Sequence, residues 1–187
     1  MVRQGLWFIR HWTLGERITR ADAWVLDEVC QPLADRLPER FPAFELGMSC
    51  QLGSVLLSAV SIIAVFVVTG MNDFGNMIFN VLIWALCVSF FFGLGRLRML
   101  VKVGMANPLR HMLLGVRILS IPFTLYVVYQ AMTAPAAFSL AVWFNAFSNI
   151  VFVVGLYFIS CQPRPPQRRP VTQLWARPAT VREGGGF

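Results

Sequence analysis

The sequence has few of the residues from which catalytic and metal sites are usually built. Its 187 residues include nine Asp or Glu, two His and four Cys. After residue 45 the only carboxylates are Asp73 and Glu183, so no pair of carboxylates can act there as general acid and general base. With only His11 and His111 available, and with cysteines at spacings that match no zinc site, we expect no metal centre.

Several sequence motifs of enzymes and cofactor sites are also missing. There is no Gly-x-Ser-x-Gly, no His-Glu-x-x-His and no phosphate-binding glycine loop. No histidine lies within the apolar stretches, where it could ligate haem. We therefore expect a protein that is not an enzyme and that holds no cofactor.

The sequence contains four long apolar runs that are nearly free of charge. They cover about residues 48–70, 74–95, 112–132 and 136–160. A bilayer core of about 30 Å requires about 20 apolar residues of helix to cross it. Because backbone groups in lipid must bond within their own helix or barrel, runs of this length favour helices. The 57% hydrophobic content agrees, and the sequence predicts an all-α integral membrane protein with four transmembrane helices.

Basic residues occur only on alternate sides of these runs. The first 45 residues carry six Arg, the link between the second and third runs carries four Arg or Lys, and the tail carries five Arg. The links 69–73 and 133–136 carry none. The positive-inside rule then predicts two cytoplasmic termini, which explains the net charge of +7 without nucleic-acid binding. Because fifteen of the sixteen basic residues are Arg, we expect a GC-rich bacterial genome and hence an inner membrane.

The two ends of the chain differ from the 46–160 bundle. Residues 1–45 form a predicted cytoplasmic amphipathic segment, with a capping box at Thr19–Asp22 and a helix that Pro32 ends. We expect this segment to lie along the membrane surface or to dock on a neighbouring subunit. Residues 161–187 form a Pro/Arg-rich tail that is predicted to be disordered unless a partner or the membrane surface orders it. With Cys30, Cys50 and Cys161 facing the cytoplasm, disulfides are not expected.

Each predicted span has polar or small residues at helical spacing. They are read as hydrogen-bonding contacts between helices, because association in lipid depends on close packing and on polar side chains. The candidate helix-packing or lipid contacts are Arg117, Asn76, Asn80, Asn145 and Asn149.

Arg117 is the single charge within a predicted span. It lies about 9 Å inside the third span at 1.5 Å per residue, so its long stem can carry the guanidinium to the interface and a lipid phosphate. Two alternatives are pairing with Asn76, Asn80 or another subunit's carboxylate, and a role in transport.

The function that we expect is that of a non-catalytic membrane subunit, scaffold or assembly component of a larger inner-membrane complex. Its partners would be membrane lipids and other membrane subunits, and not nucleic acid. The alternative is a small oligomeric transporter or channel, although proton coupling requires a membrane carboxylate and the spans have none. A membrane enzyme and a pore-forming protein are further alternatives.

Overall fold

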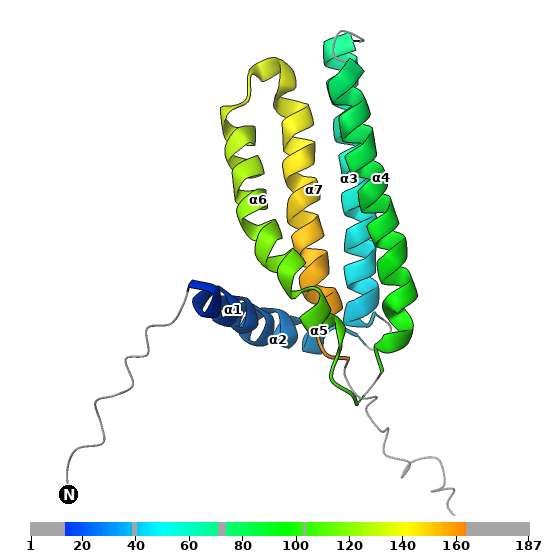
Figure 1. Ribbon diagram of the computed structural model, residues 1–187, viewed down its shortest axis with the longest axis vertical. Helices are drawn as coiled ribbons and strands as arrows, with labels where there is room; N and C mark the ends of the chain where they lie inside the picture. The colour runs from blue at the N-terminus through cyan, green and yellow to red at the C-terminus, as the bar shows by residue number, and fades with distance from the viewer. Residues whose placement is uncertain (1–13, 39–40, 71–73, 103, 164–187) are drawn as a thin grey trace, which may run out of the picture.

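The computed structural model describes residues 14–38, 41–70, 74–102 and 104–163, and Figure 1 shows their arrangement. Four helices in it are long and apolar enough to cross a membrane, which confirms the prediction of an all-helical protein with four candidate spans. They are α3 (Ala43–Thr69), α4 (Phe74–Leu97), α6 (Leu114–Thr133) and α7 (Ala136–Ser160). The single-turn η3 (Arg98–Leu100) extends α4, and the short α5 (Leu109–Met112) leads into α6.

Helices α3 and α7 form the central pair of the bundle. Helix α6 packs on the other side of α7, and α4 packs mainly on α3. Where α3 crosses α7, Gly47 faces Gly155, and a Cβ atom built on Gly47 would lie 2.8 Å from the Gly155 carbonyl oxygen. The two backbones are therefore in contact at this crossing, which only glycine permits.

Hydrogen bonds continue the α3–α7 contact along the helices. Such bonds hold helices together in lipid, where burial of apolar surface gives little driving force. They are Gln51 Nε2 to the Phe152 carbonyl (2.8 Å), Ser148 Oγ to the Ser54 carbonyl (2.9 Å) and Ser61 Oγ to the Ala141 carbonyl (2.8 Å).

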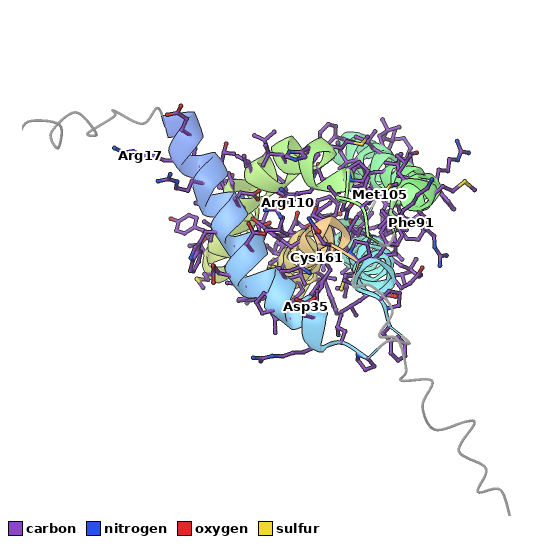
Figure 2. All side chains as sticks on the ribbon, turned by 90° about the horizontal axis from the view of Figure 1, so that it is seen from below. Arg17, Asp35, Phe91, Met105, Arg110 and Cys161 are labelled. Atoms are coloured by element: carbon purple, nitrogen blue, oxygen red, sulfur yellow. The ribbon has the colours of Figure 1, made fainter. Side chains whose placement is uncertain are left out.

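A helical rod crosses one end of the bundle, as Figures 1 and 2 show. It consists of α1 (Leu14–Trp24), the π-helical turn η1 (Val25–Cys30) and α2 (Gln31–Arg36), and it is called the N-terminal rod below. Helix α1 contacts α6, and η1 contacts α7. Leu26 is buried against Tyr157 and Cys161 near the end of α7.

The structure corrects two expectations for this rod. Pro32 does not end the helix, because it lies in the first turn of α2, where a missing N–H costs no bond. The rod ends at Leu37, which is extended as residues before proline tend to be. Thr19 forms no capping box, because it lies inside α1 and donates to the Gly15 carbonyl.

The region that connects α4 to α6 is fixed by Asn107. Its Nδ2 donates to the carbonyls of Ile159 (2.8 Å) and Cys161 (2.9 Å), and its Oδ1 accepts from the Leu109 N–H (3.0 Å). One buried amide therefore binds the carbonyl end of α7 and also positions the start of α5.

Candidate functional site: a buried arginine and a polar cavity

Arg117 and Asp22 form a buried ion pair between α6 and the N-terminal rod. Arg117 Nη2 lies 2.7 Å from Asp22 Oδ2, and Nε lies 3.0 Å from Oδ1. This is the two-point geometry in which an arginine binds a carboxylate most strongly. Arg117 is 1% exposed and Asp22 is 4% exposed. The pair joins two segments that are 95 residues apart in the sequence.

Helix α7 completes the surroundings of this pair. Tyr157 Oη donates to Asp22 Oδ1 (2.9 Å), and the Arg117 guanidinium lies 5.6 Å from the Tyr157 ring centre. Arg117 Nη1 donates to Ser160 Oγ (2.6 Å) and to the Arg110 carbonyl (3.1 Å). Asp22, Arg117, Tyr157 and Ser160 are called the arginine cluster below. Both charges are paired and further hydrogen-bonded, which is the condition for burying them.

The cluster corrects the interpretation of Arg117 as a side chain that reaches out to lipid phosphate. Its guanidinium points to a carboxylate of its own chain, because the N-terminal rod folds back across the ends of α6 and α7. Sequence analysis missed Asp22, which it placed in a capping box, and also Tyr157 and Ser160. The sequence did contain a signal for this pair. A charge within a span requires an opposite charge, and because most carboxylates lie in the first 45 residues, the partner of Arg117 was to be sought there.

The end of α7 beneath the rod carries a buried thiol. Cys161 is 3% exposed and its Sγ donates to the Tyr157 carbonyl (3.3 Å). Burial, aided by Cys30 and Asp35, raises the pKa of Cys161 from 9.0 to about 12. Burial also raises the pKa of Cys30. Since the thiolate is the nucleophile, we expect Cys161 to react slowly while the rod is in place.

We expect alkylation of Cys161 by N-ethylmaleimide to be slow and to accelerate by about tenfold per pH unit from pH 7 to pH 10, because the thiolate fraction keeps rising below the raised pKa. Peptide mass spectrometry at Cys161 measures the rate in the intact chain. The same residue in denatured protein is the control, and its rate should level off above pH 9. A native rate that levels off near pH 9 would contradict the burial of this thiol.

Asn76, Asn80 and Asn145 lie in the half of the bundle remote from the N-terminal rod, and Asn149 lies at the middle of α7. Asn80 Nδ2 donates to the Asn76 carbonyl (2.9 Å) within α4, and Asn149 Nδ2 donates to the Asn145 carbonyl (2.8 Å) within α7. These bonds run along one helix and do not join two helices. Arg117 lies at the opposite end, so the structure does not bring the five candidate residues into one site.

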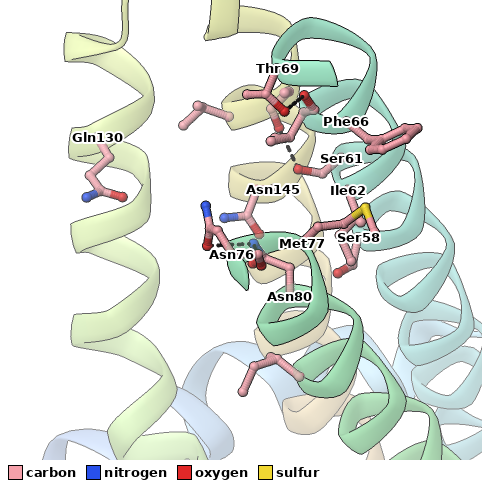
Figure 3. Close-up of a pocket in the computed structure, with 14 residues that line it drawn as sticks. Ser58, Ser61, Ile62, Phe66, Thr69, Asn76, Met77, Asn80, Gln130 and Asn145 are labelled. Carbon is pink, nitrogen blue, oxygen red and sulfur yellow. Dashed lines mark hydrogen bonds between the residues drawn. The ribbon is translucent and has the colours of Figure 1, made fainter. Parts of the chain in front are cut away.

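Asn76, Asn80 and Asn145 meet at a cavity of about 200 Å³, which Figure 3 shows. Its walls come from α3, α4, α6 and α7. The polar residues that line it are Ser58, Ser61, Thr69, Asn76, Asn80, Gln130 and Asn145. All of them are uncharged. The cavity can therefore hold water or a neutral polar group, but it has no group that could take up a proton.

Within the described parts of the chain, no three His, Cys, Asp or Glu residues lie close enough together to hold a metal ion. The four cysteines are free. Comparisons with protein-family models, with curated proteins and with solved structures found no match for this chain. Two features therefore bear on function, namely the rod held by the arginine cluster and the uncharged cavity.

Proposed function

We propose that the protein is a non-catalytic subunit or assembly component of a larger complex in a bacterial inner membrane. The observation that carries this proposal is the N-terminal rod. It is held at one end of the bundle by a buried ion pair, yet it presents large apolar side chains outward.

The rod exposes four large apolar side chains among its charged ones. Trp24 is 60% exposed, Leu33 48%, Ile18 47% and Val29 42%. These residues lie outside the four candidate spans, so the hydrocarbon core does not explain their exposure. Apolar side chains in such a position are covered by a protein partner or by the headgroup layer of the membrane. Lipids and neighbouring membrane subunits are accordingly the proposed partners.

The end of the bundle that carries the rod is the proposed cytoplasmic end. Arg98, Lys102 and Arg110 follow α4 at this end, whereas Gly70 and Ala134 at the other end have no basic neighbours in the links. The positive-inside rule supports a cytoplasmic rod and two cytoplasmic termini. Residues 1–13 and 164–187, to which the expectations of amphipathicity and disorder also applied, lie outside the described residues.

The arginine cluster supports a scaffold role because it fixes the direction of the rod. A helix attached only by apolar contacts can slide or rotate, whereas the two-point pair of Arg117 with Asp22 permits one register. A buried ion pair is weak evidence for added stability, and defining one arrangement is its best-attested role. A fixed rod with exposed apolar side chains suits docking to a partner.

The polar cavity favours a second candidate, a small oligomeric transporter or channel. Its lining of hydroxyl and amide groups could pass water or a neutral solute. It has no ionisable side chain for ion coupling, and a transporter has no need of the exposed apolar side chains on the rod. The subunit role accounts for the rod and is therefore preferred.

Replacing Trp24 and Leu33 together with Asp should release the protein from its complex. On native gels of source membranes it should migrate at a lower mass than the unmodified chain, because two carboxylates cannot be buried at an apolar contact without a large cost. Both side chains are exposed in the monomer, so its fold should survive.

Glu28→Gln is the matched control, since Glu28 is an exposed residue of the same rod. Slow alkylation of Cys161 in each variant verifies that the rod still covers α7. Unchanged migration of the Trp24→Asp, Leu33→Asp chain would count against the subunit role. Solute flux through the pure protein in liposomes, with migration as a small homo-oligomer, would support the transporter or channel.

A further inference from the structure

We propose that the cavity in the half of the bundle remote from the N-terminal rod is a binding site for a small uncharged solute that both donates and accepts hydrogen bonds. The class includes polyols of the size of glycerol and small amides. This proposal does not rest on the subunit role, since a subunit and a transporter could equally hold such a solute.

The lining selects for a neutral solute with mixed hydrogen-bonding groups. The carboxamides of Asn80, Asn145 and Gln130 each contain two donors and an acceptor oxygen, and the hydroxyl of Ser58 can do either. No charged side chain is among the lining residues, so an ion entering the cavity would lose water without gaining a counter-charge. Asn80 Nδ2 and Gln130 Nε2 already donate within the protein, but a purely apolar molecule would leave the remaining donors and acceptors of these groups unpaired.

The size of the cavity restricts the solute further. Its volume of about 200 Å³ compares with about 30 Å³ per molecule in liquid water, so it holds roughly six or seven waters. A molecule of about that many non-hydrogen atoms, such as glycerol, can replace this water and keep its hydrogen bonds. A disaccharide is too large.

The polar groups of the cavity lie too deep in the bundle to be hydrated from the membrane surface. At 1.5 Å per residue, Asn145 lies about 14 Å from the start of α7 at Ala136, and Ser58 about 17 Å from the end of α3 at Thr69. These distances reach the middle of a hydrocarbon core about 30 Å thick. Polar atoms at that depth that have no protein partner require water or a polar solute beside them, because lipid tails offer no hydrogen bonds.

A cysteine at position 58 tests access to the cavity. In the full chain, purified in detergent, Ser58→Cys should react with N-ethylmaleimide at least about tenfold faster than Leu56→Cys, because only a hydrated thiol ionises. Leu56 is a matched control, since it lies two residues away on the same helix and is 58% exposed on the bundle surface. Mass spectrometry at the labelled residue leaves the native cysteines in place.

Binding is tested by protection of this thiol. Glycerol and N-methylacetamide should slow the labelling of Ser58→Cys severalfold, whereas glycine betaine, a small zwitterion with two full charges, should not. Adding Asn80→Leu should abolish protection while labelling continues. Asn145→Leu is the second variant for the same purpose, so the test does not depend on one substitution folding.

Each outcome decides the proposal. Equally slow labelling at positions 56 and 58 would show that the cavity is dry and would overturn it. Fast labelling of Ser58→Cys without protection by either neutral solute would overturn the binding site, as would equal protection by glycine betaine. Protection that survives in both leucine variants would place the solute elsewhere and would also overturn the proposal.

Discussion

Asp22→Ala should destabilise the folded protein by about 3–5 kcal/mol, the usual cost of removing one partner of a buried ion pair. The substitution leaves the guanidinium of Arg117, which is 1% exposed, without its carboxylate, and it removes the acceptor of the Tyr157 hydroxyl. Chemical unfolding in detergent, followed by tryptophan fluorescence, measures the loss. Alkylation of Cys161 should also become faster, because the rod that covers it is released.

The second ion pair between the rod and the bundle provides the control. Asp27 lies 2.7 Å from Arg110 Nη2, but the Asp27 side chain is 50% exposed. Asp27→Ala should therefore cost no more than about 1 kcal/mol, as for other exposed pairs. Equal losses in Asp22→Ala and Asp27→Ala would contradict the role given to the buried pair.

Substitution of the arginine itself distinguishes this pair from a contact with lipid phosphate. Lysine could reach a phosphate, but it cannot reproduce the two parallel bonds from Nε and Nη2 to Asp22. Arg117→Lys should thus be nearly as unstable as Arg117→Leu. The double variant Asp22→Leu, Arg117→Met should recover much of the loss, since apolar replacement of a whole buried pair is often tolerated.

Gly47→Ala should weaken the central α3–α7 crossing by about 1–3 kcal/mol, the range found for overpacked contacts. The added Cβ would lie 2.6 Å from Ile159 Cγ1, 2.8 Å from the Ile159 nitrogen and 2.8 Å from the Gly155 carbonyl oxygen. Two of these three atoms are backbone, so the helices must separate to admit it. The same unfolding assay measures the change.

Gly53→Ala is the control on the same helix. A Cβ at Gly53 meets only Val151 Cγ1, at 3.8 Å, which is an ordinary contact. Because alanine is the better helix former by about 1 kcal/mol, this variant should be unchanged or slightly more stable. A similar loss at both positions would show that the close approach at Gly47 contributes nothing special.

The four candidate spans could be predicted from the sequence because each depends only on a run of consecutive apolar residues. Twenty or so consecutive apolar residues form a helix in lipid whatever surrounds them, so the four spans did not depend on tertiary contacts. The bounds were less accurate. Helix α3 begins at Ala43, five residues before the predicted start near residue 48. The predicted span excluded Glu45 because of its charge, but Glu45 lies in the first turn of the helix, outside the apolar part.

The polar residues within the spans were recognised as a group, but their separate roles were not. Ser54 and Ser61 bond to α7 as expected of contacts between helices, whereas Asn80 bonds within its own helix and lines a cavity. Helical spacing assigns residues to one face of a helix. Whether that face meets a neighbouring helix or a cavity depends on how far apart the helices lie.

The sequence by itself determined four apolar helices that are long enough to cross a membrane, and it determined the alternation of basic and neutral links, because both follow from residues close together in the chain. Only the tertiary structure decided what Arg117 binds. The carboxylate of Asp22 is 95 residues away, and the rod that carries it meets α6 only through the tertiary fold. Its fold-back also buries Cys161 and leaves Trp24 exposed, because one helix cannot turn all of its sides toward the bundle.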